Sequence, residues 1–325
     1  MYQIIQKRNI FLTISSILVV LSIVFLAIWG LNYGIDFSGG SLLELKFANN
    51  RPAVSDVQNA LNDLDLGSLM VQPVDDDALI LRFQNTSEEK HQEIVSRLHK
   101  LVSEDVSDST GEEENKATSS EEVVSEVSIE TKNNFEELRY DSVGPTIGAE
   151  LKRKSLLAII IVLIAIVVYV AWAFRKVSKP IESWKYGIVA NIALFHDVLI
   201  TLGVFAILGR FFGVEINAAF IAAILTVLGY SVNDTIVVFD RIRENLPKSD
   251  NDFEETINIS VNQSITRSIN TSVTTLIVLL SILFFGGGTI KDFILALSVG
   301  VFVGTYSSIF LASPILVLWE KIGKK

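Results

Sequence analysis

Six long apolar stretches constrain this chain more than any other feature of its sequence. A bilayer hydrocarbon core is roughly 30 Å thick, and a helix needs roughly 20 apolar residues to cross it. Hydrophobic residues make up 50% of the 325, and the mean hydropathy is +0.44, which is too apolar for an ordinary soluble enzyme. The sequence therefore predicts an α-helical polytopic membrane protein. The predicted spans cover residues 10–30, 155–174, 186–208, 216–239, 268–285 and 292–318.

Lys7 and Arg8 precede the first apolar stretch, as basic residues do in a secretion signal. The apolar run is longer than the hydrophobic region of a signal, however, and its end, AIWGLNYG, contains no small-x-small cleavage site. We interpret this stretch as an uncleaved anchor.

The lysines and arginines of the short loops predict the orientation in the membrane. With a cytoplasmic N-terminus (residues 1–9), the short outside loops carry only Arg210 and Lys291, although the basic cluster 152–154 disagrees by flanking the second span on the outside. Six spans place both termini on one side, so residues 31–150 are predicted to be extracytoplasmic. The basic residues then on the cytoplasmic side are Lys7, Arg8, Arg175, Lys176, Lys179, Lys185, Arg241, Arg243, Lys248, Lys321, Lys324 and Lys325.

The extracytoplasmic segment changes from helical to mixed periodicity. SLLELKF alternates like a strand, AVSDVQNALNDL has helical spacing, and LMVQPVDDDALILRF indicates two strands around an acidic turn. SEEKHQEIVSRLHKLV indicates a second amphipathic helix, and FEELRYDSV a closing strand. This β-α-β-β-α-β order predicts a small ferredoxin-like α/β domain.

The stretch 103–130 is rich in Ser, Glu and Asp and has no periodicity. It contains too few apolar residues to offset the entropy of ordering, so we expect a disordered acidic insertion. His91 and His99 lie on the polar part of the second helix, where surface positions are expected rather than metal ligation. The chain has no cysteine, which excludes disulfides, zinc–thiolate sites and a cysteine nucleophile.

Ionisable residues inside the predicted spans are the strongest indication of function. Placing one at the centre of a membrane helix costs roughly 2.5–3.5 kcal/mol, so such residues usually serve a transport pathway. Asp197, with its neighbour His196, is expected near the middle of the third span, and Asp234 lies within the fourth beside Asn233. Arg267 is at the start of the fifth span, at a depth that makes an Asp234–Arg267 pair geometrically possible.

Each of these residues also has a structural interpretation. Arg267 could extend its side chain to the interface, and His196–Asp197 could be a static hydrogen bond. Asp234 is harder to explain structurally, because its short side chain cannot reach the interface. A carboxyl in a low-dielectric medium resists ionisation, whereas a nearby cation favours it. A cation that approaches and retreats would therefore alternate the proton affinity of the acid, which is the basis of alternating access.

Six motifs distributed along the chain resemble those of the SecF family of protein-export membrane subunits. They are GIDFSGG after the first span, VGPTIGAEL before the second, FHDVLITLGVF in the third, AAILTVLGYSVNDTIVVFDRIREN in the fourth, RSINTSVTT at the start of the fifth and FFGGGTIKDF between the fifth and sixth. Together they touch most of the chain outside residues 41–140.

The resemblance implies six spans in an RND-like half-bundle with one extracytoplasmic domain. It implies that Asp234 and Arg267 conduct protons and that the proton-motive force drives preprotein movement on the outer side of the bacterial cytoplasmic membrane. The implied partners are SecD, the SecYEG channel, the SecA ATPase, unfolded preproteins and lipid, with no nucleic acid and no cofactor besides protons. Two features depart from the family: Thr146 stands where many relatives have Lys, and the acidic insertion is unusual.

Glycines at both connections to the extracytoplasmic domain suggest a pair of hinges. Glycine permits tight turns and close backbone approach, and proline restricts the entry into a helix. We expect the two connections to lie together, so that motion in the membrane could tilt the domain. Asp36 could steer the hinge or be a plain turn residue. The predicted linker residues are Gly34, Asp36, Gly39, Gly40, Gly144 and Pro145.

Three other functions remain open from the sequence. A pump of the RND type should have twelve spans and two large outside domains, twice what this chain contains. An intramembrane aspartyl protease would use Asp197 and Asp234, but their HD and ND contexts differ from the YD and GxGD contexts typical of such enzymes. A scaffold without a proton role would tolerate Asp234→Asn. A half-bundle leaves helix faces uncovered, which predicts a partner of similar fold.

Overall fold

The computed structural model describes residues 1–48, 51–74, 76–108, 135–175, 182–286 and 290–323. The chain divides into two compact units. One is a helical unit of Met1–Gly34 and Leu151–Lys325, and the other is a mixed unit of Ile35–Glu150.

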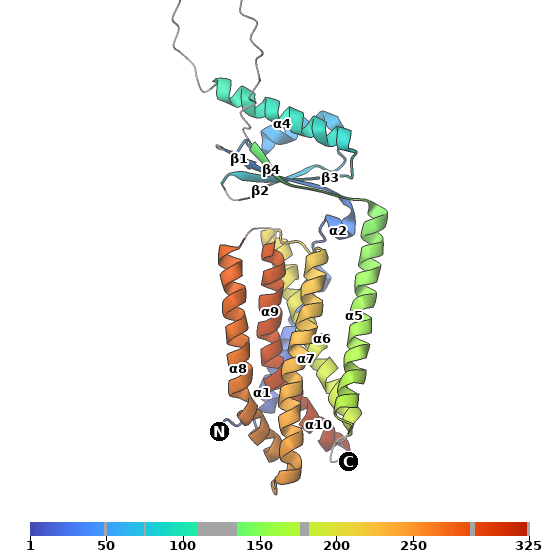
Figure 1. Cartoon of the computed structure of the whole chain (residues 1–325), viewed down its shortest axis with the longest axis vertical. Helices are drawn as coiled ribbons and strands as arrows, with labels where there is room; N and C mark the ends of the chain where they lie inside the picture. Colours follow the sequence, from blue (N-terminus) through green and yellow to red (C-terminus); the bar gives the residue numbers. More distant parts are fainter. Residues whose placement is uncertain (49–50, 75, 109–134, 176–181, 287–289, 324–325) are drawn as a thin grey trace, which may run out of the picture. The chain divides into compact units, whose positions relative to one another are not determined.

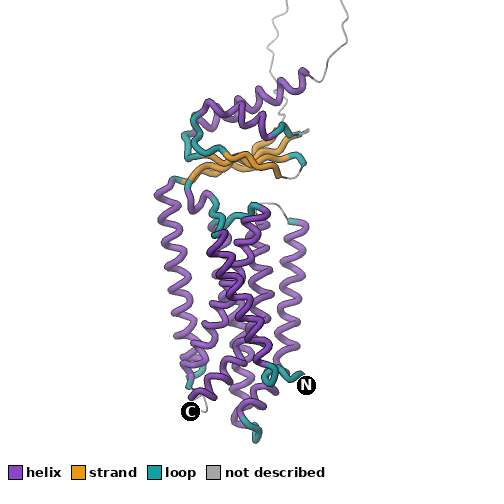
Figure 2. The backbone as a smooth tube through the Cα atoms, turned by 180° about the vertical axis from the view of Figure 1, so that it is seen from behind, coloured by secondary structure: helices purple, strands orange, loops and turns teal. Residues whose placement is uncertain are grey.

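Six helices in the described part of the chain are long and apolar enough to span a membrane, which confirms the predicted fold class. Figures 1 and 2 show the helices of the bundle running side by side. The sixth candidate span has three parts, of which the middle one, η4, is a π-helical turn. The elements are α1 (Arg8–Trp29), α5 (Pro145–Ala173), α6 (Ser183–Phe212), α7 (Ala218–Asn245), α8 (Phe253–Phe285), α9 (Lys291–Ser307), η4 (Ser308–Ala312) and α10 (Ser313–Gly323).

Helix α8 is much longer than the fifth span predicted from hydropathy, which began at residue 268. The helix starts at Phe253, where the Asp252 carboxylate accepts a hydrogen bond of 2.8 Å from the backbone N–H of Glu255. Its first half is polar, and several of its small polar residues, such as Ser260 and Ser264, are nevertheless buried. Hydropathy missed this half because its burial comes from packing against other helices and not from an apolar composition.

The bundle has a buried centre and an exposed outer ring. In the most apolar part of each span, the share of buried residues is 50% for α6 and 56% for the sixth span. The same share is only 11% for α1 and 6% for α5. Helices α6, α7 and α9 pack against one another. Any side chain that they direct at one another is therefore removed from lipid and water.

A GxxxG pair brings α9 close to α7. A Cβ added at Gly300 would lie 2.3 Å from the Val227 side chain, and one added at Gly304 would lie 2.9 Å from the Ser231 Cβ. Small residues at this spacing let two membrane helices approach until their backbones nearly touch. The approach positions the residues that follow Gly304 against α6 and α7.

The mixed unit is a four-stranded antiparallel sheet with the strand order β2-β3-β1-β4. Figures 1 and 2 show the two longer helices of the unit, α3 and α4, on one face of this sheet. Apolar side chains from β1, β3, α3 and α4 form its core, including Leu43, Leu81 and Ile94. The elements are α2 (Ile35–Ser38), β1 (Gly40–Phe47), α3 (Val54–Leu61), β2 (Met70–Val74), β3 (Ala78–Phe83), α4 (Glu88–Asp108) and β4 (Phe135–Val143). The order of these elements is the predicted β-α-β-β-α-β order.

The predicted start of the acidic insertion at residue 103 is wrong, because α4 continues to Asp108. The helix extends past the buried Val102, since each added residue gains a backbone hydrogen bond at the cost of ordering only itself. Residues 109–130 of the predicted insertion lie outside the described part of the chain.

His91 is buried, which contradicts the expected surface position. Its ring stacks on Tyr140 at 3.8 Å, with Nδ1 3.2 Å from Glu88 and Nε2 3.3 Å from Glu137. Hydrogen bonds from Gln92 and then from His91 lower the pKa of the Glu88 carboxyl. His99 is half-buried and stacks on Phe135 at 4.2 Å. Both rings pack on β4, a contact that helical periodicity alone could not reveal.

Candidate functional site

The carboxylate of Asp197 joins three helices at the centre of the bundle. Its Oδ2 accepts hydrogen bonds from Ser231 on α7, at 2.6 Å, and from Ser307 on α9, at 2.8 Å. Its Oδ1 lies 2.9 Å from Nδ1 of His196, the preceding residue on α6. Asp197 is 1% exposed. Three side-chain partners and complete burial make this acid a fixed structural junction.

His196 is buried beside Asp197, and its ring is the third partner of the Asp197 carboxylate. Its Nε2 has no hydrogen-bond partner among the described residues. Its ring lies 6.3 Å from that of Tyr306, whose hydroxyl donates to the carbonyl of Phe11 on α1 at 3.1 Å. The polar groups around His196 therefore extend toward α1.

Asp234 lies one helical turn beyond Ser231 on the same face of α7. Its Oδ2 accepts a hydrogen bond from the hydroxyl of Ser308, the first residue of η4. The residue is 9% exposed, against 1% for Asp197. Asp234 therefore has fewer hydrogen-bond partners than Asp197 and is slightly more exposed.

The consecutive residues Ser307 and Ser308 reach two different acids because the sixth span packs against both α6 and α7. Successive side chains on a helix point about 100° apart, so one faces Asp197 and the next faces Asp234. The π-turn begins at Ser308 and ends at Ala312, and Pro314 lies two residues beyond it, where it cannot donate to the Phe310 carbonyl. Neither serine was among the site residues predicted from sequence. A serine pair ahead of a proline in an apolar span was the signal that could have found them.

The structure does not bring Arg267 into an ion pair with Asp234. Arg267 is exposed on α8, and among the described residues it forms no salt bridge. The neighbouring Ser264, Ser268 and Ser272 face the bundle and are buried. Arg267 precedes Ser268 by one residue, which rotates its side chain out of the interface by about 100°. Asn233 is also exposed, on the face of α7 away from Asp234.

Helix α8 contacts its neighbours through hydroxyl groups at the level of Ser272. The hydroxyl of Thr305 on α9 donates to that of Ser272 at 2.5 Å, and the Tyr230 hydroxyl on α7 donates to it at 3.4 Å. Ser264, Ser268 and Ser272 are small, buried side chains on the face of α8 that meets the bundle. Such an interface allows close approach with few interlocking groups.

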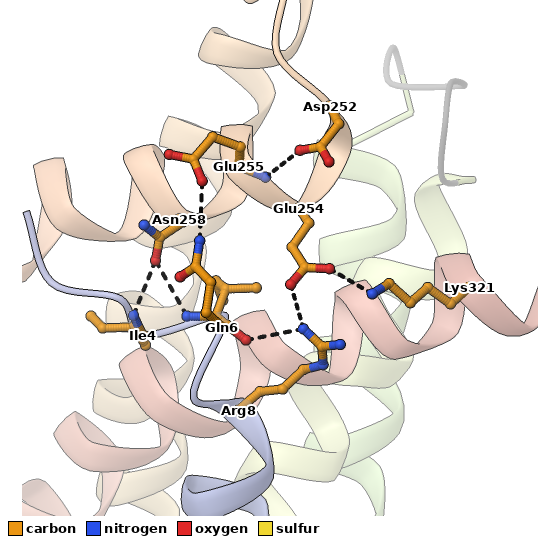
Figure 3. Close-up of polar contacts among 9 residues, drawn as sticks. Ile4, Gln6, Arg8, Asp252, Glu254, Glu255, Asn258 and Lys321 are labelled. Carbon is orange, nitrogen blue, oxygen red and sulfur yellow. Dashed lines mark hydrogen bonds and ion pairs between the residues drawn. The ribbon is translucent and has the colours of Figure 1, made fainter.

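The start of α8 is held by the N-terminal segment, as Figure 3 shows. The Asn258 side-chain oxygen accepts the backbone N–H groups of Ile4 and Ile5 at 3.1 and 3.2 Å. The Glu254 carboxylate lies 2.5 Å from both Arg8 and Lys321. These contacts join the N-terminal segment, α8 and α10 at one end of the bundle, and we refer to them as the N-terminal clamp.

The two connections to the mixed unit approach each other closely. Gly39 has a φ of +73°, and a Cβ there would lie 2.8 Å from Cα of Pro145, the first residue of α5. Gly40 has a φ of +127°, and its Cβ would lie 2.9 Å from the Phe83 carbonyl oxygen. Both positions require glycine because of this conformation and this proximity. The structure thus confirms the expected close approach, and the hinge role remains a prediction.

The other linker residues take ordinary conformations. The backbone N–H of Gly34 donates to the Ile216 carbonyl at 2.8 Å, and Asp36 lies in the first turn of the short helix α2. Gly144 immediately precedes α5 and has no backbone conformation that demands glycine.

No group of three or more His, Cys, Asp or Glu residues in the described part of the chain is arranged to hold a metal ion. The polar groups around Asp197 and Asp234 are hydroxyls and the His196 ring, which form hydrogen bonds with the two carboxylates. Such an arrangement can bind and release protons at a carboxyl group.

Comparison with known proteins relates the chain to protein export. Residues 123–322 match the family model "Protein export membrane protein SecD/SecF, C-terminal", and residues 24–50 match the SecD/SecF GG motif. The protein translocase subunit SecF of Thermobaculum terrenum is 43% identical over 98% of this chain and 94% of its own length.

Two related proteins are longer. The protein translocase subunit SecDF of Brucella abortus is 34% identical over 89% of this chain, which covers 33% of that protein. The crystal structure of SecDF from Thermus thermophilus, described as a translocon-associated membrane protein, has a TM-score of 0.76 and 32% identity. It matches 98% of this chain, which spans 39% of the solved chain. The chain therefore belongs to the SecF family of Sec-pathway protein-export subunits.

Proposed function

We propose that this subunit couples proton movement through the bundle to preprotein movement on the extracytoplasmic side of the bacterial cytoplasmic membrane. Asp234 is the proton-carrying group. The observation that carries this proposal is the environment of Asp234, an acid inside an apolar bundle with a single hydroxyl partner and residual exposure. An acid in that setting can change its protonation state without dismantling the fold.

Arg267 is the switchable positive charge in this proposal. It lies outside the bundle here, one residue from the buried Ser268. A rotation of α8 about its axis, along a face of small hydroxyl residues, would bring the guanidinium toward Asp234. The ionised acid is stabilised when the cation is near and the protonated acid when it is far. His196 and Asp197 belong to the polar pathway as its fixed part.

The uncovered helices indicate a membrane partner. Most of the apolar part of α1 and α5 is exposed. The two matching proteins named SecDF are much longer than this chain. We therefore propose that a separate SecD subunit of similar fold covers part of this surface, and that the pair acts beside SecYEG after SecA has delivered the preprotein. The distribution of basic residues in the loops supports cytoplasmic termini.

The aspartyl protease alternative finds no support in the geometry. Asp197 and Asp234 each bond to a different serine, and three side chains occupy the carboxylate of Asp197. The relatives are translocase subunits and are not named as enzymes.

The test compares Asp234→Asn with Asp240→Asn in membrane vesicles that contain the full chain, SecD, SecYEG and SecA. Asp240 is on the same helix but forms a partly exposed ion pair with Arg243 at 2.5 Å, so it controls for loss of an acid from α7. Asp234→Asn should lose the part of preprotein translocation that depends on the proton gradient, whereas Asp240→Asn should keep it. Gradient-dependent translocation by Asp234→Asn at normal abundance would overturn the proposal.

A further inference from the structure

The hydroxyl of Ser308 has two acceptors within reach. One is Oδ2 of Asp234 on α7, and the other is the backbone carbonyl of Thr305, at 3.0 Å in its own helix. A serine hydroxyl carries one hydrogen and can also accept, so it can donate to only one of these groups at full strength. Ser308 is buried and cannot turn to bulk water. Rotation of its O–H bond therefore selects between these two acceptors.

The two acceptors correspond to the two protonation states of Asp234. When the acid is ionised, its carboxylate can only accept, and the Ser308 hydroxyl donates to it. When the acid is protonated, its own O–H can donate to the Ser308 oxygen, and the Ser308 hydrogen turns to the Thr305 carbonyl. Every polar atom of the pair keeps a partner in both states, which avoids the cost of an unsatisfied buried group.

The contrast with Asp197 shows which acid this applies to. The neighbouring hydroxyl of Ser307 donates to Asp197, but Ser231 and His196 also occupy that carboxylate. Protonation of Asp197 would disturb three contacts, two of them with other helices. Ser307 also has a backbone acceptor within reach, the Gly304 carbonyl at 3.1 Å, so the difference lies in the number of contacts: protonation of Asp234 disturbs only the one with Ser308.

The titratable groups that the neighbouring helices carry in their membrane-spanning parts are engaged elsewhere or exposed. On α6, Asp197 and His196 pair with each other. On α8, Arg267 is exposed, and on α9 the Tyr306 hydroxyl bonds toward α1. Ser308 is the side chain in the described residues that forms a hydrogen bond with the Asp234 carboxylate.

We propose that Ser308 is the positioning residue for the proton on Asp234, through rotation of its hydroxyl between the Asp234 carboxylate and the Thr305 carbonyl. This inference rests on the proposed function. The proton comes from water, forms an O–H bond with the Asp234 carboxylate, and returns to water when that bond breaks. Ser308 neither gains nor loses a proton, so it tunes and orients the acid and is not itself a carrier.

Thr305, whose carbonyl is the second acceptor of the Ser308 hydroxyl, also contacts α8, the helix that is proposed to rotate. The Thr305 side chain donates to Ser272 on α8, the helix that carries Arg267. The π-turn that begins at Ser308 lies between these contacts and Pro314. π-turns in membrane and soluble helices frequently occur at functional sites.

The test uses three variants of the full chain reconstituted with SecD: Ser308→Ala, Ser308→Thr and Ser313→Ala. The alanine variant removes the hydroxyl, and the threonine variant keeps one. Ser313 is a matched control because it is also buried in the sixth span, and its hydroxyl has no hydrogen-bond partner among the described residues. The readout is the infrared carbonyl band of the protonated Asp234 carboxyl, recorded against pH and assigned by its loss in Asp234→Asn.

Ser308→Ala should move the midpoint of this titration upward by about one pH unit, because a hydrogen bond to the ionised form is stronger than one to the neutral form. The pH profile of gradient-dependent translocation should move in the same direction. Ser308→Thr and Ser313→Ala should both titrate as the wild type does. An unchanged midpoint in Ser308→Ala, in protein of normal abundance, would overturn the inference. The proposed function would survive that outcome if Asp234→Asn still abolished gradient-dependent translocation, and it would fail separately if Asp234→Asn did not.

Discussion

Ser308 on the sixth span donates its hydroxyl to the carboxylate of Asp234 on α7, while the preceding residue of the chain, Ser307, donates to Asp197 on α6. The sixth span thus connects two acids with different surroundings. One is a saturated junction and the other has a single side-chain partner. This difference separates a structural role from a functional one, and each can be tested.

Asp197→Ala should damage the fold far more than Asp234→Asn does. Removing the Asp197 carboxylate leaves the buried His196 ring and Ser231 hydroxyl without their acceptor, whereas Ser307 can still donate to the Gly304 carbonyl at 3.1 Å. We expect this loss to cost about 2 kcal/mol or more of unfolding free energy. Asp234→Asn keeps an oxygen that can accept from Ser308 and should cost less than about 1 kcal/mol. Thermal unfolding of both purified variants in detergent measures the difference. Equal losses of stability would contradict the assignment of Asp197 as the structural junction.

Arg267→Gln should leave stability unchanged but abolish gradient-dependent translocation. The side chain is exposed and forms no ion pair with any described residue, so the resting fold does not depend on its charge. Arg267→Lys keeps a positive charge and should retain part of the activity, although it loses the planar guanidinium. Unfolding temperature and translocation are measured on the same preparations. Full activity of Arg267→Gln would show that no mobile cation is needed at this position.

Gly304→Ala should weaken the packing of α9 against α7. The added Cβ would lie 2.9 Å from the Cβ of Ser231, so the helices must separate, at a cost of about 1–3 kcal/mol. Gly229→Ala on α7 is the matched control, because a Cβ there meets no atom within 4 Å and should stabilise the helix by about 0.5–1 kcal/mol. Unfolding temperatures should therefore change in opposite directions. A stabilised Gly304→Ala would refute the close helix approach.

Asn258→Ala should release the N-terminal clamp. Asn258 is 1% exposed and accepts two backbone N–H groups, so its loss leaves both donors unsatisfied and should cost about 1–3 kcal/mol. The N-terminal segment should also become more sensitive to protease. Asn251→Ala removes an exposed asparagine and serves as the control. If both variants resist protease equally, the segment is held by other contacts.

The membrane-spanning character of the chain could be predicted closely because hydropathy is a local property. Each apolar stretch identifies itself without reference to any other, and the acids within them stand out by the cost of their burial. Hydropathy and periodicity fail for α8, where packing against other helices buries residues of the polar first half. They also fail for His91, whose ring stacks on that of Tyr140. Both depend on contacts between distant segments.

The sequence by itself determined that this is a six-span membrane protein with a small α/β unit and acids within its apolar helices. Only the tertiary structure decided that Asp197 joins three helices, that Ser308 forms a hydrogen bond with Asp234, and that the Arg267 side chain is exposed. The physical reason is rotation about the helix axis. A shift of one residue turns a side chain by about 100°, and only the packing of all the helices determines which residue of a pair such as Arg267 and Ser268 faces inward.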